Sequence, residues 1–117
     1  MSSLADTPIV LSKKGDAPMP AAEAEALLEQ VPGWQIVSED GVDKLTRDFR
    51  FKDYLVIIDL AHKVGRIAEQ NDHHPEMHVA WGTLTVTWWT HVTGGLHKND
   101  FIMAARCNRA AMLVSAP

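Results

Sequence analysis

Proton transfer is the chemistry that the second half of the chain indicates most strongly. Histidine is the side chain whose unperturbed pKa lies closest to neutral pH, so grouped histidines can both give and take protons. Three of the six histidines fall into one pattern, each with a carboxylate or an aromatic residue nearby in the sequence. This cluster consists of Glu69, His73-His74-Pro75, Trp81, His91 and Asp100. We therefore predict a proton-transfer site built from these residues.

Two carboxylates are spaced so that they could assist the histidines. Glu69 precedes His73 by about one helical turn, and Asp100 lies in the first turn of an expected helix that follows His91. We expect Glu69 to orient His73 and Asp100 to orient His91. Each carboxylate also has an ordinary explanation, because Asp100 could simply complement the helix dipole and Glu69 could be a solvated surface charge. The prediction of a site rests on the joint pattern.

The elements that must position these residues follow one another in a simple order. Apolar periodicity and breaks at Pro or Gly predict helices over 20–31, 53–71 and 99–114, and strands over 34–39, 44–51 and 78–91 with an interruption at Gly82. Asp40-Gly41 is a strong hairpin signal. The order α-β-β-α-β-β-α predicts an α+β fold, a four-stranded antiparallel sheet with helices packed on one face. The apolar arc of the 53–71 helix is wider than one sheet face requires, which indicates contact with another subunit.

Length and composition narrow the class of protein. From 117 residues we expect a flexible N-terminal lead-in over 1–19 and a single domain over 20–117. Hydrophobic residues at 46% and charged residues at 22% are typical of a soluble globular chain. A net charge of −4 without a basic block argues against nucleic-acid binding, and no apolar run reaches the roughly 18 residues of a membrane span. Cys107, the only cysteine, has no intrachain partner, which favours a cytoplasmic location.

A metal site is the alternative that the same residues leave open. On a strand His74, Glu76 and His78 would share one face, and together with His91 they could bind zinc. The sequence His74-Pro75-Glu76 also matches half of the zinc deaminase signature, but the Pro-Cys-x-x-Cys half is absent. A mixed histidine and carboxylate site therefore remains as the metal hypothesis.

One pattern of acidic, histidine and turn residues extends over most of the chain. It consists of Glu69, His73-His74-Pro75-Glu76, Trp81, Thr90-His91, Gly95-Leu96 and Asp100. With this spacing, and with Gly33-Trp34 and the stretch from Phe49 to Asp53, the chain resembles the pterin-4a-carbinolamine dehydratases, also called 4a-hydroxytetrahydrobiopterin dehydratases, over about residues 20–110. Met77, Trp81 and His97 depart from the residues common in that family. Met77 and Trp81 could reshape the pterin pocket, which leaves the preferred pterin side chain open, whereas His97 replaces the usual cap of the final helix.

The resemblance implies a metal-free dehydration reaction. Water is eliminated from a 4a-hydroxytetrahydropterin to give the quinonoid dihydropterin, which recycles the cofactor of aromatic amino acid hydroxylases. The resemblance implies that His73 and His91 are the acid and the base in either order, that His74 holds the pterin and that Glu69 tunes His73. The other expected substrate contacts are Trp81, Asp100, Trp34 and Glu76. It further implies no cofactor and a homodimer or homotetramer.

Two other classes of function remain as alternatives. Some members of the family also serve as dimerisation partners of a transcription factor, so the chain could be a non-catalytic pterin-binding or partner-binding protein of the same fold. The set of three histidines argues against lost catalysis, because binding alone does not require titrating groups. The metal-dependent enzyme described above is the second alternative.

Overall fold

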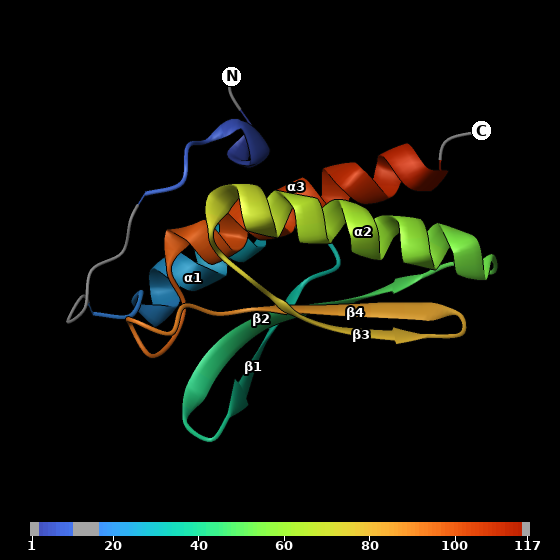
Figure 1. Cartoon of the computed structure of the whole chain (residues 1–117). Helices are drawn as coiled ribbons and strands as arrows, with labels where there is room; N and C mark the ends of the chain where they lie inside the picture. The colour runs from blue at the N-terminus through green and yellow to red at the C-terminus, as the bar shows by residue number, and fades with distance from the viewer. Residues whose placement is uncertain (1–2, 11–16, 116–117) are drawn as a thin grey trace.

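The computed structural model describes residues 3–10 and 17–115, and its centre is one antiparallel sheet. The strands are β1 (Gln35–Glu39), β2 (Val42–Arg50), β3 (Glu76–Ala80) and β4 (Thr83–Trp88), and they lie in the order β1-β2-β4-β3. A short 3-10 helix, η1 (Leu4–Asp6), precedes α1 (Ala21–Leu28), α2 (Tyr54–Asn71) and α3 (Lys98–Ser115). The helices lie on one side of the sheet (Figure 1). The predicted α+β fold and its element order are therefore confirmed.

The predicted hairpin turns at Asp40-Gly41. Both residues have positive φ, 52° and 80°, which is the conformation that a two-residue type I′ hairpin turn requires. Val42 pairs with Glu39 directly across the turn. Val42 and Asp43 therefore belong to β2, which begins two residues before the predicted strand over 44–51.

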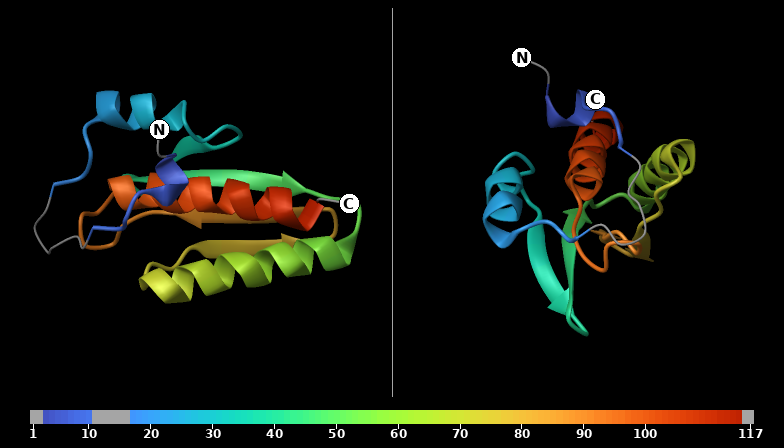
Figure 2. Two further views of the ribbon diagram at one scale, coloured as in Figure 1. Left: turned by 90° about the horizontal axis from the view of Figure 1, so that it is seen from above. Right: turned by 90° about the vertical axis from the view of Figure 1, so that its left-hand side faces the viewer.

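The two long helices, α2 and α3, run antiparallel to each other across the sheet (Figure 2). The Asp53 side chain caps α2 by accepting a hydrogen bond of 2.9 Å from the Leu55 amide. At the other end Asp72 adopts a left-handed conformation with φ 48° and ψ 43°, which ends the helix and turns the chain toward β3. His73 and His74 follow this turn immediately, so the end of α2 fixes where both histidines emerge.

The core lies between the sheet and the helices. Leu84, Val86 and Trp88 on β4 are fully buried, as expected for alternate residues that face the helices. The other large buried side chains are Phe49, Phe101, Leu45, Ile57, Leu60, Ile102, Met103, Val31 and Val64. Cys107 also lies in the core, where burial raises the pKa of its thiol to about 12. No helix in the described ranges has the length and apolar character needed to cross a membrane.

The N-terminal segment, defined here as residues 3–10, packs against α3 (Figure 1). Leu4 and Ala5 are buried there. Within the predicted lead-in over residues 1–19, the backbone of this segment is hydrogen-bonded to side chains of α3. Residues 1, 2 and 11–16 lie outside the described part of the chain.

Candidate active site

His73 is held in place by a buried carboxylate and by an aromatic ring. Its Nε2 lies 2.6 Å from Oδ1 of Asp100, which has no exposed surface. The second oxygen of Asp100, Oδ2, accepts hydrogen bonds from the Thr90 hydroxyl at 2.8 Å and from the His97 amide at 2.9 Å. The imidazole also stacks on the Trp88 indole, with 5.3 Å between ring centroids and 25° between planes. The orientation of the His73 ring is therefore fixed by residues from β4 and from the start of α3.

His74 has a different acidic partner. Its Nε2 lies 2.7 Å from Oε1 of Glu69, and both side chains are largely exposed. The pairing therefore differs from the predicted one, in which Glu69 assists His73 and Asp100 assists His91. The reason is the left-handed residue Asp72, because the helix ends before His73 and the ring is no longer one regular turn beyond Glu69.

His91 lies in a tight turn between β4 and α3. The turn is closed by the Thr90 amide, which donates to the Gly95 carbonyl at 2.9 Å, and by the Gly94 amide, which contacts the Thr90 and His91 carbonyls. The exposed His91 ring lies against the Trp89 indole, with 5.1 Å between centroids. Among residues 3–10 and 17–115, no carboxylate is hydrogen-bonded to His91. This histidine is therefore positioned by its backbone and stands apart from the Asp100 network.

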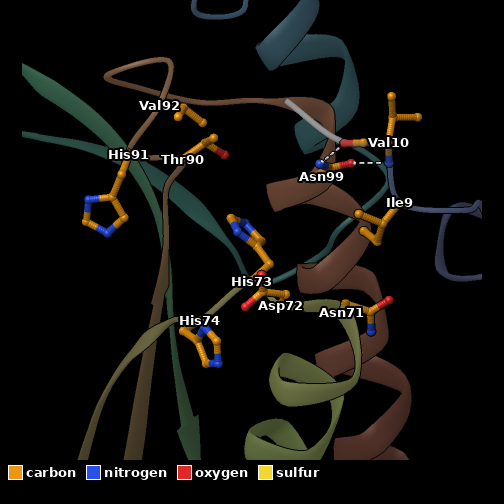
Figure 3. Close-up of a pocket in the computed structure, with 10 residues that line it drawn as sticks. All are labelled: Ile9, Val10, Asn71, Asp72, His73, His74, Thr90, His91, Val92 and Asn99. Carbon is orange, nitrogen blue, oxygen red and sulfur yellow. Dashed lines mark hydrogen bonds between the residues drawn. The ribbon is translucent and has the colours of Figure 1, made fainter. Parts of the chain in front are cut away.

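The three predicted histidines line one pocket of about 430 Å³ (Figure 3). A pocket of this volume is in the range that holds small organic molecules. The residues that line it are Ile9, Val10, Asn71, Asp72, His73, His74, Thr90, His91, Val92 and Asn99. The end of α2, the turn after β4 and the N-terminal segment thus meet at one site that contains three groups able to transfer protons.

None of the four residues predicted to contact substrate, Trp34, Glu76, Trp81 and Asp100, is among those that line this pocket. Trp34 is only 5% exposed, and its indole N–H donates to Oδ1 of Asn108 at 2.7 Å. Trp81 is 84% exposed at the turn between β3 and β4. Glu76 lies on β3, where its carboxylate is 3.2 Å from Nε2 of His78. Glu69 and Asp100 reach the pocket only through the histidines that they contact.

Several lining residues are not predicted from the sequence. Asp72 could have been recognised, because it lies between the end of the helix predicted over 53–71 and His73. No sequence pattern indicates Asn99, Ile9 and Val10, since contacts between distant parts of the chain bring them to the pocket. As to the metal hypothesis, no three histidine, cysteine or acidic side chains lie close enough to hold an ion in the part of the chain that the structure describes.

Comparison with known families identifies the family of the chain. A family model described as pterin 4 alpha carbinolamine dehydratase matches residues 17–110. The chain belongs to this family. The pterin-4a-carbinolamine dehydratases are hydro-lyases, enzymes that eliminate water, and the match contains every histidine of the pocket.

Bacterial relatives match most of the chain. A protein from Chlorobium luteolum, named for pterin-4-alpha-carbinolamine dehydratase, is 45% identical over 106 residues, which cover 91% of this chain and 93% of its own. A relative from Marinobacter nauticus with the same name is 50% identical and covers 78% and 83%. The crystal structure of a transcriptional coactivator/pterin dehydratase from Brucella melitensis superposes with a TM-score of 0.75 at 34% identity, covering 80% of this chain and 98% of that one.

Proposed function

We propose that the chain catalyses the dehydration of 4a-hydroxytetrahydropterin to the quinonoid dihydropterin by histidine acid–base catalysis, without a metal or an organic cofactor. In the cell this reaction would regenerate tetrahydropterin for an aromatic amino acid hydroxylase. The observation that carries the proposal is the buried Asp100 that holds His73 at the pocket of a chain in the dehydratase family.

The contact with Asp100 favours one tautomer of His73. An ionised carboxylate can only accept hydrogen bonds, so His73 donates from Nε2, and its Nδ1 carries the free lone pair when the ring is neutral. In our proposal Nδ1 of His73 is the base that removes the ring N–H proton of the substrate. Trp88 and Asp100 keep the ring from rotating away from this orientation.

His91 is the acid in this scheme, and His74 is the binding residue. Protonated His91 gives its proton to the 4a-hydroxyl, which leaves as water as the bond between carbon and oxygen breaks. The electrons of the broken N–H bond form the new double bond of the quinonoid ring, so one proton is taken and one is given. His74, whose ring is paired with Glu69, holds the polar edge of the pterin. Each positioned acid or base typically contributes a hundredfold to ten-thousandfold in rate.

The direct test is the dehydration of enzymatically generated 4a-hydroxytetrahydropterin, followed by absorbance with and without EDTA. We expect acceleration above the spontaneous rate that EDTA leaves unchanged. His78→Ala is the matched control, because His78 also contacts a carboxylate, that of Glu76, but does not line the pocket. Loss of the acceleration on EDTA treatment would support the metal hypothesis, and no acceleration at all would contradict the proposal.

A binding role is the second candidate, and the name of the Brucella structure favours it. That protein is titled both a coactivator and a pterin dehydratase. For this chain, pterin binding without acceleration of the dehydration would support the binding role.

We also infer that the chain forms a homodimer or homotetramer in the cytoplasm. Large apolar side chains are exposed on α2 and at the β3–β4 hairpin, namely Tyr54, Leu55, Ile58, Val79 and Trp81. Tyr54 and Ile58 are one helical turn apart on α2, and exposed apolar side chains that gather on one face are typical of subunit contacts. The buried free thiol of Cys107 agrees with a reducing compartment. Light scattering on the purified chain tests the oligomeric state.

A further inference from the structure

Two residues of the N-terminal segment line the pocket although they precede the matched family region, residues 17–110. We propose that Ile9 and Val10 form an apolar wall of the substrate site that contacts the substituent on the pterin ring and so helps to select the substrate. This inference rests on the proposed function, because it assigns a specificity role within the same pocket.

The segment is fastened to α3 along its length. The Arg106 guanidinium donates from Nε to the Ala5 carbonyl and from Nη2 to the Thr7 carbonyl, each at 3.0 Å. Arg109 lies 2.7 Å from the Asp6 carboxylate, and this hydrogen bond lowers the pKa of Asp6. Leu4 and Ala5 are buried at the same contact. The path of the backbone toward the pocket is therefore fixed before it reaches Ile9.

Asn99 holds the segment at the pocket itself. Its side-chain amide accepts a hydrogen bond from the Val10 N–H at 3.0 Å and donates one to the Val10 carbonyl, as the dashed lines in Figure 3 show. Asn99 is only 5% exposed, and both of its polar groups are used in this contact. Since the next residue is Asp100, the position of Val10 is tied to the residue that holds His73.

The chemistry of the wall indicates which part of the substrate it would meet. The histidines and Asp72 are polar, whereas Ile9, Val10 and Val92 contribute hydrocarbon surface to the same pocket (Figure 3). Val10 is 62% exposed even though both polar groups of its backbone are bonded. The pterin ring has polar edges that suit the histidines, so an alkyl or hydroxyalkyl substituent is the part of the substrate that fits the wall.

The test compares two pterins in the full-length chain. Ile9→Ala and Val10→Ala are measured beside Val37→Ala, a control on β1 away from the pocket. The substrates are the 4a-hydroxy forms of dihydroxypropyl-tetrahydropterin and of a tetrahydropterin without the side chain. We expect each wall variant to raise KM for the substituted pterin about five- to tenfold, with KM for the bare pterin and both kcat values within about twofold of wild type.

Equal changes for the two pterins, or wall variants that match Val37→Ala, would overturn the inference. Failure of the proposed function is a separate result, because it would appear as an inactive wild-type chain. Ile9 and Val10 are not fully buried, so these truncations are expected to leave the chain folded, and an unchanged unfolding midpoint confirms it.

Discussion

Replacing Asp100 by Asn is the sharpest test of the role assigned to His73. The substitution keeps the shape of the side chain but replaces one carboxylate oxygen by an NH2 group. Oδ2 accepts from two donors, the Thr90 hydroxyl and the His97 amide, so that position must remain an oxygen. The NH2 group is therefore placed at the former Oδ1, facing Nε2 of His73. His73 must then accept at Nε2 and carry its proton on Nδ1.

The structure separates the effect on rate from the effect on stability. Asp100→Asn keeps the two hydrogen bonds to Oδ2 and reverses the direction of the third, so we expect the free energy of unfolding to fall by only about 1 kcal/mol. Asp100→Ala loses all three and should cost roughly 3 kcal/mol. With Nδ1 protonated, His73 can no longer act as the base, and the rate of dehydration should fall by about a hundredfold to ten-thousandfold.

The assay is dehydration of 4a-hydroxytetrahydropterin under single-turnover conditions, together with urea unfolding of each variant. Asp59→Asn, on the exposed surface of α2, is the matched control for the loss of one negative charge. A folded Asp100→Asn variant that retains a rate within threefold of wild type would refute both the tautomer argument and the assignment of His73 as base.

Three further predictions follow from the same structure. His91→Ala should lose most of the turnover and remain folded, whereas His62→Ala, on the exposed side of α2, should keep the wild-type rate in the same assay. The pKa of the Cys107 thiol is raised to about 12, so between about pH 9 and pH 12 the unfolded chain releases a proton that the folded chain keeps. Stability should therefore fall by up to about 1.4 kcal/mol per pH unit over that range, and urea unfolding should show this slope reduced in Cys107→Ala. His97→Ala should lower the free energy of unfolding by about 1 kcal/mol, because Nδ1 of His97 accepts the Asn99 amide at the start of α3, and His97→Ser should restore most of it.

The fold could be predicted because its signals are local. The alternation that buries Leu84, Val86 and Trp88 has the two-residue period of a strand, and the Asp40-Gly41 turn requires residues that tolerate positive φ. Both signals can be recognised within a few neighbouring residues. The same holds for the end of α2, since Pro75 excludes a longer helix.

The three histidines that line the pocket could be recognised in the sequence, but their pairing with carboxylates could not. The contact between His73 and Asp100 joins residues 27 apart, and it exists because α2 packs beside α3. The spacing of Glu69 and His73 suggested a regular helical pair, which the left-handed residue Asp72 prevents. The contact of Asn99 with Val10 spans 89 residues, so no local pattern indicates it.

The carboxylate of Asp100 also couples the three segments that hold the pocket, so that they are expected to open together. It connects the turn after α2, the turn after β4 and the first turn of α3 through three hydrogen bonds that share two oxygens. Releasing His73 therefore leaves a buried charge with fewer partners, which favours opening of the three segments as one local unfolding event. A ligand that tightens the His73 contact would slow amide exchange at His97 and Asp100, although neither residue lines the pocket.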